Sequence, residues 1–111
     1  MSLAATADAA PLFAALGEPV RLRLIDRLAR DGPLASVELR ADVPVTRQAI
    51  AKHLAVLLEA GLVESERVGR DRRWRVRPDR LSEAGALLDA LSRRWDDRLA
   101  RLKALVEADP A

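Results

Sequence analysis

A dense group of arginines lies in the stretch 67–80 of the 111-residue chain. These residues include seven arginines and two aspartates, a local net charge of +5, whereas the remaining segments are each weakly acidic and the whole chain carries +2. A concentration of guanidinium groups on a near-neutral protein is typical of a phosphate-binding element. A solvated charged strand is the alternative interpretation. The arginines expected to make sequence-independent phosphate or minor-groove contacts are Arg70, Arg72 and Arg73.

A second group of polar side chains is expected on one face of a helix in the middle of the chain. Arg47 and Gln48 can form paired hydrogen bonds with guanine and adenine, respectively, and Lys52 is placed for a phosphate or a base acceptor. Thr46 suits both a helix cap and a phosphate contact, and the two roles can coexist. The set indicates a helix that enters a nucleic-acid groove, although Glu59 near its end argues mildly against this.

The residue types needed for covalent or redox chemistry are scarce. The chain has no cysteine, no tyrosine and one histidine. It also lacks a nucleophile elbow and a glycine-rich phosphate loop, so neither an enzyme activity nor a cofactor is expected. Without cysteine there are no disulfides and no thiolate metal sites, which fits a cytoplasmic location. No apolar run approaches the roughly 20 residues of a membrane helix, and the N-terminus does not resemble a secretory signal.

The chain is expected to form a single domain over residues 11–108, preceded by a loose alanine-rich lead-in over residues 1–10. Within the domain, a first helix ends at Gly17 and a second occupies the stretch 18–32. A short third helix begins with Ser36 as its N-cap.

A fourth helix is expected at about residues 46–60, with Thr46 as its N-cap and Gly61 beyond its end. Its apolar stripe faces the core and comprises Ile50, Leu54, Leu57 and Leu58. Gln48 and Lys52 lie opposite this stripe, and Thr46 and Arg47 lie at the exposed N-terminal end of the helix. His53 lies on the flank of the stripe. A lone histidine in such a place is more often structural than functional.

The arginine-rich stretch belongs largely to a predicted hairpin at about residues 62–77, with its turn at 69–71. In the second strand Trp74 and Val76 point to one face, whereas Arg73, Arg75 and Arg77 point to the other. One face therefore packs, with Trp74 in the core rather than in a ligand site. The other face presents a row of arginines.

The last predicted helix runs over about residues 79–108 and is unusually long. Its apolar stripe is close to a heptad seam and comprises Leu81, Ala84, Leu88, Leu91, Trp95, Leu99, Leu102 and Val106. A helix of about 28 residues spans about 40 Å, which is more than so small a domain can cover. The stripe therefore needs a partner, and a second copy in a two-fold dimer is the simplest one.

Two alternatives for this helix remain open. The stripe can fold back onto its own domain, and Trp95 can line an effector pocket instead of the dimer seam. The residues expected at a dimer interface are Leu12, Phe13, Leu88, Leu91, Trp95, Leu99 and Leu102.

The order helix, helix, tight turn, helix and basic hairpin is that of a winged helix-turn-helix module. The motifs that carry the resemblance lie at residues 16–24 (LGEPVRLRL), 45–57 (VTRQAIAKHLAVL), 60–63 (AGLV) and 68–70 (VGR). In these motifs, over about residues 12–108, the chain resembles ArsR-type transcriptional regulators. The resemblance implies a mainly α fold with a small β-hairpin (α+β) and a sequence-specific DNA-binding regulator.

The resemblance further implies a homodimeric repressor on a pseudo-palindromic operator, and it places His53 near the DNA. The expected partners are double-stranded DNA and a second copy of the chain, while a small-molecule effector remains open. A protein-interaction module that binds an acidic partner is the alternative function.

The sequence departs from many members of this family in its metal-binding positions. The third helix has no cysteine after its Glu38-Leu39 pair, and the last helix has no histidine. No metal site is therefore expected. The acidic residues of the last helix, Asp89, Asp96, Asp97 and Glu107, are expected to pair with neighbouring arginines.

Overall fold

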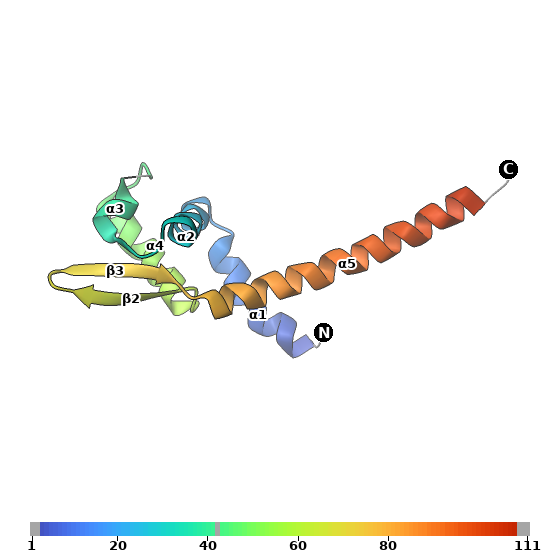
Figure 1. Ribbon diagram of the computed structural model, residues 1–111, viewed down its shortest axis with the longest axis horizontal. Helices are drawn as coiled ribbons and strands as arrows, with labels where there is room; N and C mark the ends of the chain where they lie inside the picture. Colours follow the sequence, from blue (N-terminus) through green and yellow to red (C-terminus); the bar gives the residue numbers. More distant parts are fainter. Residues whose placement is uncertain (1–2, 42, 109–111) are drawn as a thin grey trace.

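The computed structural model of the chain describes residues 3–41 and 43–108. Five helices and three strands follow one another as α1 (Leu3–Leu16), α2 (Pro19–Asp31), β1 (Leu34–Ala35), α3 (Ser36–Arg40), α4 (Arg47–Glu59), β2 (Val63–Val68), β3 (Asp71–Val76) and α5 (Pro78–Ala108). Figure 1 shows a small body of helices, a hairpin at one end, and α5 projecting as an arm. The predicted fold class, mainly α with a small sheet and a long last helix, is confirmed.

The N-terminal segment differs from the expected loose lead-in. Helix α1 begins at Leu3, so the described residues before position 11 are helical, and Ala9 is buried. The first two residues lie outside the described ranges. The alanine-rich composition explains the difference, because alanine has the highest intrinsic helix propensity.

Helix α2 begins and ends where the sequence predicts. The Glu18 carboxylate accepts a hydrogen bond from the backbone N–H of Arg21 at 2.8 Å, and Pro19 is the first helical residue. At the other end Gly32 has a φ of 78°, which glycine adopts without the steric cost that other residues meet. These local signals position α2, whose buried face carries Leu24, Ile25 and Leu28.

The prediction of Ser36 as an N-cap is wrong. Ala35 holds the cap position of α3, and its backbone N–H donates to the Glu38 carboxylate at 3.1 Å. The Ser36 hydroxyl instead accepts a hydrogen bond from Trp74 Nε1 at 3.0 Å. The partner is 38 residues away in the sequence, so no local pattern could have indicated this contact.

The sheet contains a strand that the sequence pattern did not reveal. The two-residue β1 pairs antiparallel with β3, Leu34 opposite Trp74, and gives the order β1-β3-β2. The predicted hairpin is confirmed, since β2 and β3 pair antiparallel from Val63 opposite Val76 to Val68 opposite Asp71. A strand this short carries too little periodicity to be recognised.

The helix predicted from its N-cap and apolar stripe is confirmed as α4, with one exception in the stripe. Thr46 Oγ1 accepts a hydrogen bond from the backbone N–H of Ala49 at 3.1 Å, and Ile50, Leu54 and Leu57 are buried. Leu58, the fourth residue of the predicted stripe, is 42% exposed. It lies at the edge of the stripe, beyond the reach of the core.

Removing the cap of α4 should destabilise the domain. For Thr46→Ala we expect a loss of about 1 kcal/mol in the free energy of unfolding, because the backbone N–H of Ala49 loses its acceptor. Urea denaturation followed by circular dichroism measures this loss. Thr46→Ser retains the acceptor oxygen and should stay close to the parent protein, so equal losses in both variants would contradict the capping role.

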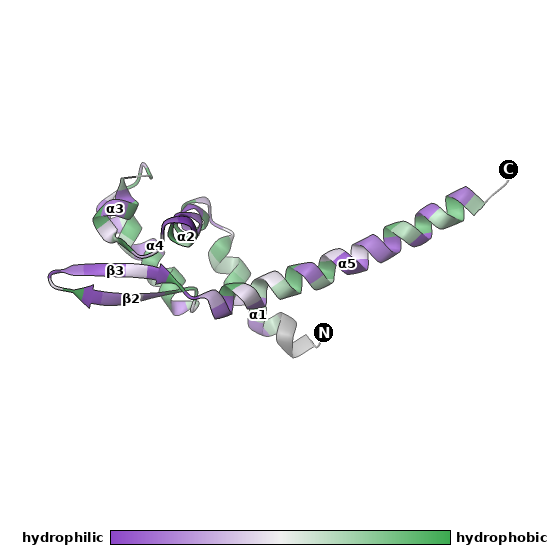
Figure 2. Ribbon diagram, in the orientation of Figure 1, coloured by the Kyte–Doolittle hydropathy of each residue, from purple (hydrophilic) through white to green (hydrophobic). Residues whose placement is uncertain are grey.

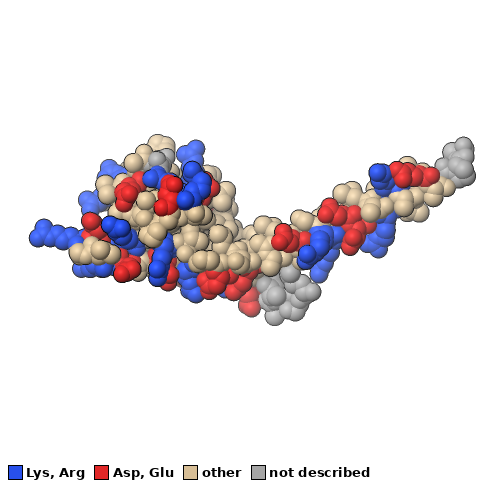
Figure 3. Space-filling model, viewed as in Figure 1, with Lys and Arg blue, Asp and Glu red and all other residues tan. Residues whose placement is uncertain are grey.

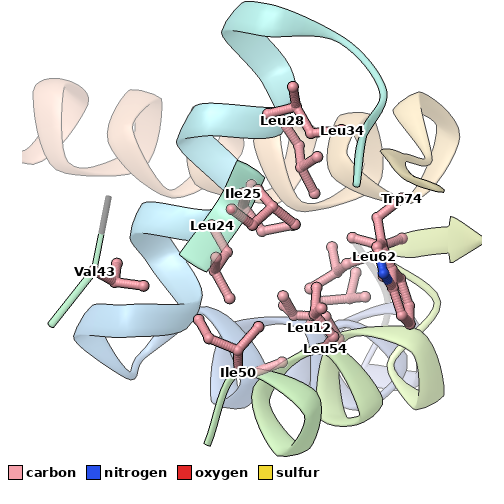
Figure 4. Close-up of a cluster of buried hydrophobic side chains, with 14 of the residues drawn as sticks. Leu12, Leu24, Ile25, Leu28, Leu34, Val43, Ile50, Leu54, Leu62 and Trp74 are labelled. Carbon is pink, nitrogen blue, oxygen red and sulfur yellow. The ribbon is translucent and has the colours of Figure 1, made fainter. Parts of the chain in front are cut away.

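One hydrophobic core joins the helices to the sheet (Figure 4). It draws on every helix and strand, and its largest fully buried side chains are Leu12, Leu24, Leu39, Leu54, Leu57, Leu62 and Val63. Leu12 has an exposed fraction of 0%, so it has no surface to offer a second chain. Its assignment to the dimer interface is therefore wrong, whereas Phe13 packs at the margin of the core and is partly exposed.

Only the first third of α5 belongs to the domain. Ala84 and Leu87 are buried and Leu81 is partly buried, where α5 packs against α1. Leu87 is absent from the predicted stripe, which continues along the arm as exposed apolar residues (Figure 2). The stripe does not fold back onto its own domain: Trp95 is 63% exposed. Within the described ranges, no helix is long and apolar enough to cross a membrane.

Candidate nucleic-acid interface

Helix α4 presents a polar, sterically open outer face. Burial of its inner stripe fixes the rotation of the helix, and the cap at Thr46 fixes its first turn. As a result Arg47, Gln48 and Lys52 are all exposed, separated by the small exposed side chain of Ala51. A helix with hydrogen-bonding side chains at its N-terminal end and no bulky residues between them can enter a DNA major groove.

The hairpin formed by β2 and β3, hereafter the wing, has a charged tip and a largely neutralised base. At the base the Arg75 guanidinium lies 2.7 Å from the Glu64 carboxylate across the strands, and Arg77 lies 2.9 Å from Asp79. Arg80, at the start of α5, pairs with Glu83 at 2.8 Å. Three of the seven clustered arginines thus have acidic partners. In the predicted row, Arg75 and Arg77 are paired with acids, which leaves Arg73, nearer the tip, without one among the described residues.

The tip of the wing carries the basic charge that has no acidic partner. Arg67, Arg70 and Arg73 are exposed, and the described part of the chain gives them no hydrogen bond or ion pair. Arg72 donates to the Ser65 hydroxyl at 2.7 Å, and its guanidinium lies 5.9 Å from the centroid of the Trp74 ring. Figure 3 shows basic side chains projecting at this end of the molecule.

A groove of about 560 Å³ separates the wing tip from α4 and α3. Its walls carry four arginines from three elements, Arg40 of α3, Arg47 of α4, and Arg70 and Arg72 of the wing. Trp74 also lines it. The tertiary structure therefore brings one residue of the predicted set on α4, Arg47, to the same groove as Arg70 and Arg72 of the wing. Arg40 was missed from the sequence, because nothing in the local pattern of α3 distinguishes it from any exposed helical arginine.

Comparison with known proteins supports the same arrangement. A family model described as "Helix-turn-helix domain" matches residues 16–66, which run from the end of α1 into β2. The HTH-type transcriptional regulator Rv2034 of Mycobacterium tuberculosis is 37% identical over 95 residues, covering 86% of this chain and 85% of that protein. The uncharacterized HTH-type transcriptional regulator YuzN of Bacillus subtilis is 45% identical over 67 residues, 55% of this chain and 73% of that protein.

A solved structure decides the family. The ArsR-like transcriptional regulator from Rhodococcus sp. RHA1 superposes with a TM-score of 0.76 at 37% identity, covering 98% of this chain and 100% of that one. The chain belongs to the ArsR-type family of transcriptional regulators. It is accordingly a DNA-binding transcriptional regulator with a winged helix-turn-helix fold.

The structure gives His53 of this ArsR-type chain intramolecular partners. Its Nδ1 lies 3.4 Å from the Arg21 guanidinium and 3.5 Å from the Glu18 carboxylate, and Arg21 Nε donates to the Ala15 carbonyl at 2.7 Å. These contacts tie α4 to the junction of α1 and α2. They favour the structural role for His53, because through Nδ1 the ring joins α4 to the residues at that junction.

The Glu18 carboxylate links this junction to the stability of the fold. The hydrogen bond from the Arg21 backbone holds the pKa of Glu18 below its usual value, with smaller contributions from the His53 and Arg21 charges. A carboxylate whose pKa is lowered by folding stabilises the fold at pH values above its unfolded pKa, and that contribution disappears as the pH falls.

We therefore expect Glu18→Gln to reduce the acid sensitivity of the fold. The urea midpoint of the parent protein should fall between pH 6 and pH 3, through the usual glutamate pKa of about 4.3, and this fall should be smaller in the variant. Glu66→Gln is the matched control, because it removes an exposed wing carboxylate that has no side-chain hydrogen bond or ion pair within the described ranges. The same fall in the Glu18 and Glu66 variants would contradict the assigned role.

Within residues 3–41 and 43–108, no group of three or more histidine, cysteine, aspartate or glutamate residues could hold a metal ion. On α5, Lys103 and Glu107 approach to 3.8 Å, one helical turn apart.

Proposed function

We propose that the protein is a homodimeric repressor that binds a pseudo-palindromic operator in double-stranded DNA. The groove between α4 and the wing tip carries the proposal, because it sets Arg47 of the polar helix face beside Arg70 and Arg72, which have no acidic partner among the described residues. A duplex can fill such a groove with its phosphate backbone while the recognition helix enters the major groove.

The two basic sets divide the work of recognition. Arg47 and Gln48 read base edges, and Lys52 contacts a phosphate or a base acceptor. Arg70, Arg72 and Arg73 of the wing contact phosphates or the minor groove, and Arg40 adds a phosphate contact from α3. The Thr46 hydroxyl, exposed at the start of α4, serves as a cap and can also meet a phosphate.

The arm formed by α5 supplies the dimer. Its exposed apolar residues form a stripe that a monomer would leave in water, namely Leu88, Leu91, Trp95, Leu99, Leu102 and Val106. Burial of such a stripe against a second copy is favourable by about 25 cal/mol per Å² of apolar surface. Two recognition helices related by the dimer axis then read half-sites about 10 bp apart, or a multiple of that spacing.

Bound across a promoter, such a dimer excludes other proteins from the DNA, which is the basis of repression. The proposal places the protein in the cytoplasm, without enzyme activity. The residues that bind DNA and those that associate with the second chain lie on separate elements, so the two functions can be tested separately.

Selection of bound fragments from random double-stranded DNA tests the proposal. We expect a pseudo-palindromic consensus, and affinity for it should fall steeply with salt because phosphate contacts release counterions. A selected DNA fragment mixed with the purified protein should form a complex that contains two protein chains per duplex. Absence of binding to any DNA at low salt would overturn the proposed function.

A further inference from the structure

The groove between the wing tip, α3 and α4 combines two kinds of surface. Guanidinium groups line it from three elements, and apolar side chains line it as well. A DNA phosphate can use the guanidinium groups, but it gains nothing from contact with the apolar side chains. We propose that the groove also binds a small aromatic carboxylate, and that this ligand displaces DNA from the regulator.

The charge of the groove suits a carboxylate. Arg40 and Arg47 are exposed, and neither makes a side-chain hydrogen bond or ion pair within residues 3–41 and 43–108. Arg70 and Arg72 line the other side, and Asp71 is the one acidic residue among the lining side chains. A guanidinium group binds a carboxylate through two parallel hydrogen bonds. An anion in the groove therefore finds several donors and offsets the repulsion between them.

The apolar part of the groove suits an aromatic ring. Its floor is formed by the edges of core side chains, Ile50, Leu54 and Trp74 (Figure 4). Val37 and Ala51 line it from α3 and α4. Val37 is 74% exposed, the highest value for a large apolar side chain in the described part of the chain, and it lies outside the α5 stripe on which the proposed dimer rests. A ring in the groove would cover this side chain.

Contacts within the protein hold part of the groove in place before a ligand arrives. Trp74 Nε1 donates to the Ser36 hydroxyl at 3.0 Å, and both residues line the groove. The Arg72 guanidinium lies 5.9 Å from the centroid of the Trp74 ring and donates to Ser65 at 2.7 Å. Preformed sites lose little conformational entropy on binding. The volume of about 560 Å³ lies within the range of small-molecule pockets, about 300–1,000 Å³.

The carboxylate and DNA compete for the same side chains. Arg47, Arg70 and Arg72 line the groove and are also assigned to DNA in the proposed function. Because one guanidinium group cannot satisfy both anions, each ligand lowers the apparent affinity for the other. Displacement of DNA rests on the proposed function, whereas binding of the carboxylate does not.

Titration of the full chain with naphthoate, without DNA, tests the site. The chain has two tryptophans, and only Trp74 lines the groove, since Trp95 lies exposed on α5. In a proton–nitrogen correlation spectrum we expect the indole signal of Trp74 to shift and saturate while that of Trp95 stays in place. Naphthamide has the rings without the charge, and acetate has the charge without the rings, so each should bind at least about tenfold more weakly.

Three results of this titration would overturn the site. The Trp74 signal could fail to move at naphthoate concentrations up to about 10 mM, which would exclude a ligand of useful affinity. A shift of the Trp95 signal alone would place the ligand on the arm. Equal affinity for naphthamide would show that the arginines do not take part.

Variants of exposed residues locate the two halves of the ligand. Arg40→Gln should raise the naphthoate dissociation constant about tenfold, because it removes a charged donor. Arg30→Gln, on α2 outside the groove, is the matched control and should leave the constant unchanged. Val37→Ser should raise it about fivefold through the loss of apolar contact. Equal constants for the Arg40 and Arg30 variants would place the carboxylate elsewhere.

Competition on a selected operator tests the displacement. Naphthoate should release the operator, whereas acetate at the same ionic strength should not. Val37→Ser, whose side chain has no part in the proposed DNA contacts, should retain operator affinity and need about fivefold more naphthoate for release. A naphthoate-induced shift of Trp74 with unchanged operator affinity would overturn the displacement. A chain that binds naphthoate but no DNA would contradict the proposed function and leave the carboxylate site standing.

Discussion

Replacing Trp95 by glutamate is expected to convert the proposed dimer into monomers. Trp95 is the largest exposed apolar side chain on α5 and stands at the centre of the stripe. In the dimer the substitution would remove aromatic surface and bury two carboxylates close to each other. We expect a cost of at least about 3 kcal/mol, which corresponds to roughly a hundredfold increase in the dissociation constant.

Sizing with light scattering over a dilution series measures the change. Ala100→Glu is the matched control, because it adds the same charge to the arm outside the stripe and should stay dimeric. The Trp95 variant should also lose affinity for a two-half-site operator while retaining weak binding to DNA in general, since its α4 and wing are untouched. An unchanged dimer would place the interface elsewhere on the molecule.

Replacing Gln48 by alanine should lower affinity for the selected operator and relax its sequence preference. The loss of a paired hydrogen bond to a base costs about 1–3 kcal/mol at that position, and Arg47→Ala should behave alike at another base pair. Both side chains are exposed and lie outside the core, so the stability of the domain should be unaffected. Binding curves with single-base operator variants measure the effect.

Replacing Arg70 in the wing should have a different signature. Arg70→Ala is expected to weaken binding to all sequences and to lower the slope of log affinity against log salt by about one. Arg30→Ala on α2 is the control, because Arg30 pairs with Asp26 on the exposed face of that helix. An equal loss of base preference in the Gln48 and Arg70 variants would contradict the division between base reading and phosphate contact.

Much of the scaffold could be predicted from sequence because its signals are local. The signals for the ends of α2, the cap at Thr46 and the alternation around Trp74 each act within a few residues. These signals can therefore be identified in the sequence without knowledge of the fold. The same holds for the outer face of α4, since burial of the inner stripe at a period of 3.6 residues leaves the polar side chains outside.

The predictions that failed concern residues whose environment is made by distant parts of the chain. Ser36 became a partner of Trp74 rather than a cap, and Leu12 is enclosed by the core instead of facing a second chain. The contacts of His53 with Glu18 and Arg21, which no prediction covered, likewise join residues more than 30 positions apart in the sequence. The periodicity of a helix or strand gives the direction in which a side chain points. Which residues it contacts in that direction depends on how the elements pack together.

Sequence patterns alone indicate the type and order of the elements, the excess of arginine in one hairpin and the apolar stripe of the last helix. Which of the arginine charges are available to a ligand depends on how the chain folds. The tertiary structure neutralises Arg75 and Arg77 with Glu64 and Asp79, and it leaves the basic charge at the wing tip, opposite Arg40 and Arg47. The physical reason is range: helix and strand formation depends on neighbours along the chain, while the net charge of a surface depends on which side chains lie within a few ångströms in space.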